Sequence, residues 1–174
     1  CRAKHDDRQL YELFIIELFQ AGLSWALILN KRENFRQAYD DFDIDKVINY
    51  DKNKVDSLLR DKGIIRNRSK IEASISNSRI FRSIQIEYGS FDRYIWGFSN
   101  NTTIYENASV TTDEISDRVS EDLTRRGMKY AGSTSIFSYL QSIGIINSHT
   151  KECFFYEEIL SEISDIPKVM RESN

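Results

Sequence analysis

Helix-ending glycines recur along almost the whole chain, and they constrain its fold more than any other feature. Gly22, Gly89, Gly127 and Gly144 each follow a segment that can form a helix, and glycine is common at helix ends because it adopts a left-handed backbone without steric cost. Helices are expected over residues 7–21, 25–39, 44–50, 54–61, 67–88, 91–98, 116–127 and 133–144, with Ser24, Asp43, Asn53, Ser90 and Ser116 among the capping residues. Residues 103–110 alternate only weakly and are expected to form a loop, so the predicted fold class is all-α, a compact multi-helix domain.

One acidic residue interrupts an apolar helix near the N-terminus. Glu17 lies within the apolar stripe that positions 10, 13, 14, 18 and 21 define, and its other neighbours over residues 15–19 are apolar too. A buried, unpaired carboxylate is costly, so such a group raises its pKa or finds hydrogen-bond donors. A satisfied structural network and a chemical role are both open for Glu17 at this point.

The composition describes an ordered protein of one domain or two small lobes. The chain has 174 residues, 40% of them hydrophobic, and a single proline. Two cysteines are too few for a disulfide framework. Because no apolar run of about 18 residues and no secretion signal occur, a cytoplasmic protein that does not enter a membrane is expected. The chain begins at Cys1 without a methionine, which predicts that the natural N-terminal segment is missing here.

The net charge of −3 hides an uneven distribution of charges. Residues 60–70 carry five basic side chains and one aspartate, a net charge of +4, whereas residues 40–56 carry six aspartates and three lysines. A basic segment on an acidic protein can still attract phosphate. A solvated helix face is the alternative explanation.

The basic segment has the layout of a helix-hairpin-helix element. Residues 61–66 join two expected helices, and Gly63 stands where a positive φ is predicted. The backbone N–H groups of such a turn and the following helix N-terminus can bind a DNA phosphate without reading the base sequence. Two helices that merely pack together are the alternative. The residues expected to contact DNA here are Lys62, Gly63, Ile64, Arg66 and Arg68.

The turn between the first two helices is expected to contact DNA as well. Leu23 is predicted at an exposed corner beside Gly22, where an apolar tip can enter the base stack and help a nucleotide out of the duplex. Trp25 offers a flat surface on which an extruded base can stack. The alternatives are that Leu23 is a hydrophobic staple and that Trp25 is a core anchor.

His149 and Cys153 are candidate metal ligands. An imidazole and a thiolate four residues apart suit one side of a tetrahedral zinc site, which needs about four ligands. Cys1 and His5 could complete the set by count, and an ordinary turn is the alternative.

Several motifs together resemble those of the 3-methyladenine DNA glycosylase I family. They occur in the same order and at compatible spacing over about residues 5–155, and they comprise residues 16–25, 31–35, 63–68 and 126–130, the aromatic residues Phe91, Trp96 and Phe98, and Gly144, His149 and Cys153. The resemblance implies a helix-hairpin-helix glycosylase fold, removal of 3-methyladenine from alkylated double-stranded DNA, and a structural zinc ion. It also implies a glycosylase domain over residues 1–155, with the helix-hairpin-helix around 54–88, followed by an acidic tail over residues 156–174.

The resemblance assigns roles to individual residues. Glu17 matches the pocket carboxylate that accepts hydrogen bonds from the methylated adenine, Trp25 matches the stacking aromatic residue, and Ser138 matches a small polar residue near the pocket. The element that fills the gap left by the flipped nucleotide is matched by Gln20, Gly22 and Leu23, and the C-terminal pair of zinc ligands by His149 and Cys153. The other Cys and His ligands and two pocket tyrosines of the family would lie upstream of Cys1, which occupies a glycine position. The zinc site is therefore expected to be incomplete in this chain.

The expected activity is that of a monofunctional hydrolase. An ionised Glu17 should pair with the cationic methylated base far better than with neutral adenine, and Trp25 should add a cation–π contact. No lysine is placed to form a Schiff base with the sugar, and a monomer is expected. The competing interpretations are a non-enzymatic helical DNA-binding module and an all-α interaction protein that never meets DNA.

Overall fold

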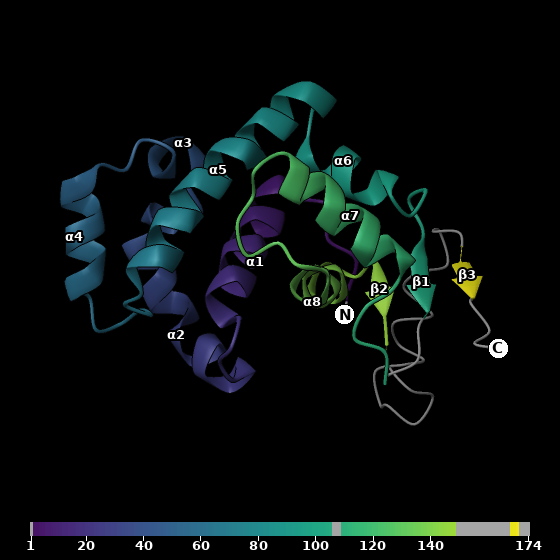
Figure 1. Ribbon diagram of the computed structural model, residues 1–174, viewed down its shortest axis with the longest axis horizontal. Coiled ribbons are helices and arrows are strands. Elements are labelled where there is room, and N and C mark those ends of the chain that lie inside the picture. The colour runs from purple at the N-terminus through teal and green to yellow at the C-terminus, as the bar shows by residue number, and fades with distance from the viewer. Residues whose placement is uncertain (1, 106–108, 149–167, 171–174) are drawn as a thin grey trace.

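The computed structural model describes residues 2–105, 109–148 and 168–170, without the side chains of Trp25 and of residues 168–170. Helices dominate these residues, and three short strands lie together at one end of the molecule (Figure 1). The elements are α1 (Asp7–Gln20), α2 (Trp25–Ala38), the 3-10 helix η1 (Asp40–Phe42), α3 (Ile44–Val47), α4 (Lys52–Arg60), α5 (Arg68–Tyr88), α6 (Phe91–Gly97), β1 (Thr103–Tyr105), α7 (Glu114–Arg125), α8 (Ser133–Ile143), β2 (Ile146–Asn147) and β3 (Lys168–Met170). The prediction of an all-α fold class is confirmed.

The loop expected over residues 103–110 is wrong where β1 forms. The strands make a small sheet in the order β2-β1-β3, and β1 runs parallel to both neighbours. Ile104 of β1 is opposite Ile146 of β2, and both side chains are buried. The pairing partners of β1 lie more than 40 residues away in the chain, so a local sequence pattern could not reveal them.

Most of the helices begin or end at the capping residues that the sequence predicted. The side chains of Ser24, Asp43 and Ser90 cap α2, α3 and α6, and Gly89 ends α5 with a φ of 84°. Two predicted caps are wrong. Asp51 caps α4 in place of Asn53, and Asp113 caps α7 in place of Ser116, because in each case a carboxylate further upstream accepts the free backbone N–H of the first turn. Ser116 instead returns a hydrogen bond to the backbone of Asp113, forming a capping box.

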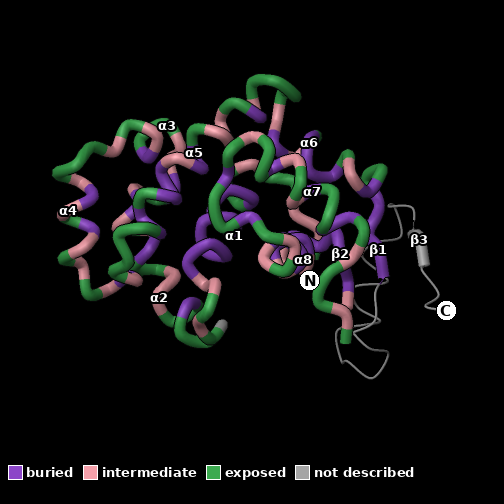
Figure 2. The backbone as a smooth tube through the Cα atoms, in the orientation of Figure 1, coloured by how far each residue is buried: buried purple, intermediate pink, exposed green. Residues whose placement is uncertain are grey.

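Helix α1 is the centre of the hydrophobic core. All of its residues from Leu10 to Phe19 are buried, and Figure 2 shows it as a buried helix with the longer α5 crossing nearby. It contacts α2, α5, α6 and α8, so no face of the helix is left to solvent over this stretch. Removing so much apolar surface from water is the main stabilising contribution to such a fold. Among the described residues, no helix combines the length and the apolar character needed to span a bilayer.

Asn77 connects α5 to the loop between α7 and α8. Its side chain is fully buried, donates to the carbonyl of Lys129 at 2.7 Å and accepts from the backbone N–H of Lys129 at 2.8 Å. These two bonds fix the position of the next residue, Tyr130, which has a φ of 59°. A positive φ is strained for a bulky residue and persists only where the surroundings enforce it.

Replacing Asn77 by alanine should lower the free energy of unfolding by about 2 kcal/mol, since the N–H and the carbonyl of Lys129 both lose the partner that the buried amide provides. Denaturant unfolding monitored by circular dichroism measures this. The control is Ser76→Ala on the same helix, whose hydroxyl donates to the carbonyl of Ala73 in its own helix and to no other group in the described ranges. A change below about 0.5 kcal/mol is expected there. Equal effects of the two substitutions would contradict the importance of the Lys129 contact.

Candidate active site

Helix α1 contains two buried carboxylates with opposite surroundings. Glu12 is 7% exposed and accepts hydrogen bonds from Arg32 at 2.7 Å and from Arg36 at 3.0 Å, both on α2. Glu17 is 4% exposed, and its Oε1 atom is buried without a hydrogen-bond partner in the described part of the chain. Glu12 is therefore the carboxylate whose partners form a satisfied structural network. The absence of a partner at Glu17 favours a chemical role, because an orphaned buried carboxylate only costs stability.

Burial has a direct effect on the protonation of Glu17. Loss of solvation raises the pKa of Glu17 from 4.5 to about 7. Near neutral pH the side chain is thus close to half ionised in the free protein, and a cation placed beside it would shift the balance to the carboxylate. The predicted burial of Glu17 is confirmed.

Helix α8, which contains Ser138 and Tyr139, packs against α1. Tyr139 is buried, donates its hydroxyl to the carbonyl of Leu10 at 3.0 Å and contacts Phe14 edge-on. Its burial raises its pKa, and the negative charges of Asp7 and Glu17 raise it further. Ser138 is the half-buried neighbour of Tyr139 on the same helix.

The α1–α2 turn, residues 20–24, follows Glu17 by one helical turn. Gly22 is exposed, has a φ of 80°, and has open space where a Cβ would lie. Leu23 packs partly against the core rather than standing fully exposed as predicted. The turn is closed by two bonds between Gln20 and Leu23, one from the Leu23 N–H to the Gln20 carbonyl at 2.7 Å and one from the Gln20 side chain to the Leu23 carbonyl at 2.9 Å. Trp25 begins α2 at the end of this turn, and its side chain lies outside the described part of the structure.

The connection between α4 and α5 forms a tight turn against α2. The positive φ predicted for Gly63 is wrong, because no left-handed backbone occurs at this residue. Gly63 is required by close packing instead, since a Cβ there would lie 3.0 Å from the Asn34 Cβ and 3.0 Å from the Asp61 Oδ1. The ammonium of Lys31 on α2 donates to the carbonyls of Lys62 and Gly63 at 3.1 and 3.2 Å. These two bonds attach the turn to α2.

The side chains of the turn divide into exposed cations and a buried anchor. Lys62 and Arg66 are exposed, whereas Ile64 is 3% exposed and belongs to the core. The backbone N–H groups of residues 64–66 donate to no acceptor in the described part of the chain. The turn therefore carries two exposed cations beside N–H groups that have no acceptor among the described residues.

The positive charge predicted for residues 60–70 is only partly on the surface. Arg68 pairs with Asp56 at 2.9 Å and with Glu72 at 3.6 Å, so its charge is largely balanced. Lys70 is 8% exposed, and its ammonium bonds to backbone carbonyls at the end of α1. Lys70 is one of the five basic residues in the charge predicted for this segment, and its burial removes it from the surface. A helical register that groups it with Ser74, Asn77 and Phe81 would have placed it on the buried face.

The predicted metal ligands His149 and Cys153 lie outside the described residues. His5 is engaged elsewhere, because its Nδ1 lies 2.8 Å from Asp92 and its ring stacks on Trp96. Within residues 2–105, 109–148 and 168–170, no group of three or more His, Cys, Asp or Glu side chains is arranged to hold a metal ion.

Comparison with known proteins identifies the family. The model of the methyladenine glycosylase family matches residues 1–156 of the chain. The chain belongs to this family. Membership confirms the family that the sequence motifs predicted and, with it, the prediction of a DNA glycosylase, a hydrolase.

Curated methyladenine glycosylases are similar over most of their length. DNA-3-methyladenine glycosylase 1 of Escherichia coli is 36% identical over 156 residues, which are 87% of this chain and 83% of the relative. DNA-3-methyladenine glycosylase of Haemophilus influenzae is 32% identical, over 87% of this chain and 85% of the relative. The solved structure of 3-methyladenine DNA glycosylase I from Staphylococcus aureus, described as showing the basis of 3-methyladenine recognition, has a TM-score of 0.84 at 30% identity and covers 88% of this chain and 84% of its own. This chain therefore has the same overall helical fold as that methyladenine glycosylase.

Proposed function

We propose that this protein hydrolyses the N-glycosidic bond of 3-methyladenine in alkylated double-stranded DNA, as the first step of base-excision repair. The observation that carries the proposal is the buried, unpaired carboxylate of Glu17 in a methyladenine glycosylase. The reaction adds water across the bond between the base and the deoxyribose, releasing the free base and leaving an abasic site. The names of the relatives support the same substrate.

Glu17 selects the lesion by charge. Methylation at N3 gives adenine a fixed positive charge, which already weakens its glycosidic bond, so the enzyme need not protonate the leaving base. The Glu17 carboxylate, which is buried and has no cationic partner among the described residues, gains a charge-assisted hydrogen bond when the cationic base enters. Neutral adenine offers no charge to offset the ionisation of a side chain whose pKa is about 7. Normal bases are therefore rejected without any need to recognise the shape of the methyl group.

The α1–α2 turn brings the nucleotide to Glu17. Gly22 leaves the tip of the turn open, and Leu23 provides the apolar group that fills the space left in the base stack. Gln20 holds the carbonyl of Leu23 in place. Trp25 stacks on the extruded base, and Ser138 lines the same pocket from α8.

The α4–α5 connection acts as a helix-hairpin-helix that binds one DNA phosphate. The free N–H groups of residues 64–66 and the N-terminus of α5 are donors of the kind that bind phosphate oxygens. Lys62 and Arg66 add exposed positive charge. Arg68 is the first residue of α5, so its side chain lies beside the helix N-terminus that binds the phosphate. Ile64 acts through its backbone, because its side chain anchors the turn in the core.

Release of free base from methylated duplex DNA tests the function. The purified chain should release 3-methyladenine, detected by chromatography, and should leave abasic sites in an intact strand. Borohydride should trap no covalent enzyme–DNA adduct, since a monofunctional hydrolase forms no Schiff base. Binding of duplex without release of any base would support the non-enzymatic DNA-binding module instead, and a lack of salt-dependent DNA affinity would support an interaction protein.

Substitution of Gly63 by alanine tests the phosphate-binding turn. The added Cβ would force Asn34 or Asp61 to move by a few tenths of an ångström, which displaces the N–H donors, and an approximately fivefold to tenfold weaker affinity for undamaged duplex is expected. Gly97→Ala is the matched control, because a Cβ at Gly97 meets no atom within 4 Å. Fluorescence anisotropy at fixed ionic strength measures both. If Gly63→Ala binds duplex as tightly as Gly97→Ala, the turn is not the phosphate site.

Three further properties remain predictions. Zinc binding by His149 and Cys153 rests on the resemblance of sequence motifs, and metal analysis of the purified chain with and without His149→Ala tests it. Action as a monomer is tested by light scattering on the protein alone and on its DNA complex. A cytoplasmic location is tested by cell fractionation.

A further inference from the structure

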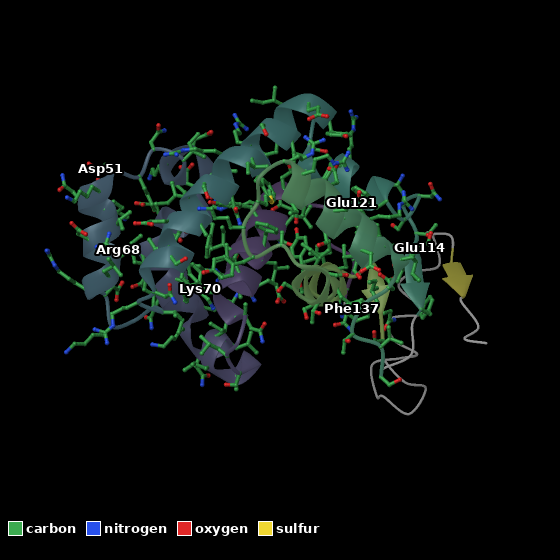
Figure 3. All side chains as sticks on the ribbon, viewed as in Figure 1. Asp51, Arg68, Lys70, Glu114, Glu121 and Phe137 are labelled. Carbon is green, nitrogen blue, oxygen red and sulfur yellow. The ribbon has the colours of Figure 1, made fainter. Side chains whose placement is uncertain are left out.

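Lys70 connects two parts of the molecule that contact DNA in the proposed function. It lies in the first turn of α5, where its backbone N–H bonds to the capping side chain of Asn67. Its ammonium reaches α1, where it donates to the carbonyl of Phe19 at 2.9 Å and to that of Ala21 at 2.6 Å. Figure 3 shows Lys70 near the beginning of α5 on the side of α1, and Arg68 on the side of α4. One side chain thus joins the end of α1 to the helix terminus that would bind phosphate.

The surroundings of this ammonium are unusual for a buried cation. Lys70 is 8% exposed, yet no ion pair with a carboxylate forms in the described part of the chain. Its charge is balanced by carbonyls at the C-terminal end of α1, which have no partner within their own helix and carry the negative end of the helix dipole. Burial lowers the pKa of Lys70, so the cation is kept in place at a cost in solvation. A residue needed only to fill space would not require a charge here.

Lys70 also contacts the aromatic ring of Tyr130. The ammonium lies 6.0 Å from the ring centroid of Tyr130, whose hydroxyl bonds to Ser69 at 2.9 Å. Tyr130 is 40% exposed and keeps its left-handed backbone through the bonds between Asn77 and Lys129. The first turn of α5 is therefore fixed on one side by the Tyr130 loop and on the other by Lys70.

We propose that Lys70 is a positioning residue that holds the α1–α2 turn at a set distance from the phosphate-binding end of α5. Ala21, to which it bonds, directly precedes Gly22 and Leu23, and Glu17 lies on the same helix one turn earlier. When α5 binds a phosphate of the duplex, Lys70 keeps Leu23 aimed at the neighbouring base step. This inference rests on the proposed function, since only base extrusion makes that alignment necessary.

The substitution Lys70→Met tests the proposal, because methionine keeps most of the apolar length and removes both hydrogen bonds. Amide hydrogen exchange in residues 20–24 should become at least tenfold faster, while exchange in α8 stays unchanged. Single-turnover excision of 3-methyladenine from duplex should fall at least tenfold. The affinities for undamaged duplex and for free 3-methyladenine should stay within threefold of the unsubstituted protein, a separation that general loss of structure would not produce. Lys70→Gln, which keeps one amide donor, takes its place if Lys70→Met does not fold.

Lys62→Met is the matched control, since Lys62 is an exposed lysine in the connection that precedes α5. It should weaken duplex binding without changing exchange in residues 20–24. Unchanged exchange in the Lys70 variant would overturn the proposal, and so would faster exchange with normal excision. If the unsubstituted protein released no base, the proposed function would fail, and the alignment that the proposal explains would have no role. Failure of the Lys70 prediction alone would leave the proposed function intact.

Discussion

Replacing Glu17 by glutamine is expected to lower the rate of 3-methyladenine excision by about 10²–10³-fold. The substitution keeps the size of the side chain and removes the negative charge that pairs with the cationic base. Losing one member of a buried, hydrogen-bonded charge pair costs about 2–5 kcal/mol, and each 1.4 kcal/mol changes a rate by about tenfold. Single-turnover kinetics with methylated duplex DNA measures the change, and affinity for undamaged duplex should be unaltered.

The pH dependence of excision separates charge from shape. Because the pKa of Glu17 in the free protein is about 7, kcat/KM should fall about tenfold per pH unit on the acid side of that value, as the carboxylate takes up a proton. The fixed charge of the lesion does not titrate, so this limb belongs to the protein. The residual activity of Glu17→Gln should be flat over the same range.

Glu12→Gln provides the matched control for the kinetics. It makes the same chemical change on the same buried helix. The Glu12 carboxylate pairs with Arg32 and Arg36, whereas Glu17 has no partner among the described residues. Its acid limb should remain near that of the unsubstituted protein. Excision by Glu17→Gln at the normal rate, or an equal loss in both variants, would refute selection by the charge of Glu17.

The substitution Glu17→Gln should also make the protein more stable at high pH. A carboxyl group whose pKa rises from 4.5 in the unfolded chain to about 7 in the folded protein binds its proton more tightly when folded. Stability is therefore highest below pH 4.5 for this group, declines as the pH rises toward 7, and is lowest above it. The shift corresponds to about 3 kcal/mol above pH 8, which Glu17→Gln should recover in large part, less what the buried amide loses in hydrogen bonds.

Denaturant unfolding at pH 4 and at pH 8.5 measures this second effect. Glu17→Gln should match the unsubstituted protein at pH 4 and exceed its free energy of unfolding by up to about 3 kcal/mol at pH 8.5. Glu12→Gln should show no such gain, because it weakens contacts to two arginines. A Glu17→Gln variant that is no more stable at pH 8.5 would mean that the carboxylate already has a partner in the folded protein.

Taken together, the two results would show a residue that reduces stability and is needed for activity. Such a conflict is typical of functional sites, where a group is kept unsatisfied in the free protein so that the ligand can satisfy it. The two carboxylates of α1 give an internal comparison, since they share a helix and a degree of burial and differ in their partners.

The sequence alone determined where most of the helices begin and end and that Glu17 is buried. Helix ends depend on residues within one turn, so Gly89, Ser24 and Asp43 could be assigned from local chemistry. Burial of Glu17 followed from the apolar residues on every side of it in the same helix. The motifs of the methyladenine glycosylase family were also readable, because they are contiguous stretches.

Only the tertiary structure decided which groups meet across the chain. The parallel pairing of β1, the packing of Gly63 against Asn34 and the reach of Lys70 to Ala21 each join residues about 30 to 65 positions apart. The difference between Glu12 and Glu17 also depends on such contacts, since both are acidic residues in one apolar helix and the arginines come from α2. Local sequence fixes the backbone preference of a segment and the face that it buries. The partner of a buried polar group is set by the packing of whole helices, which no single segment contains.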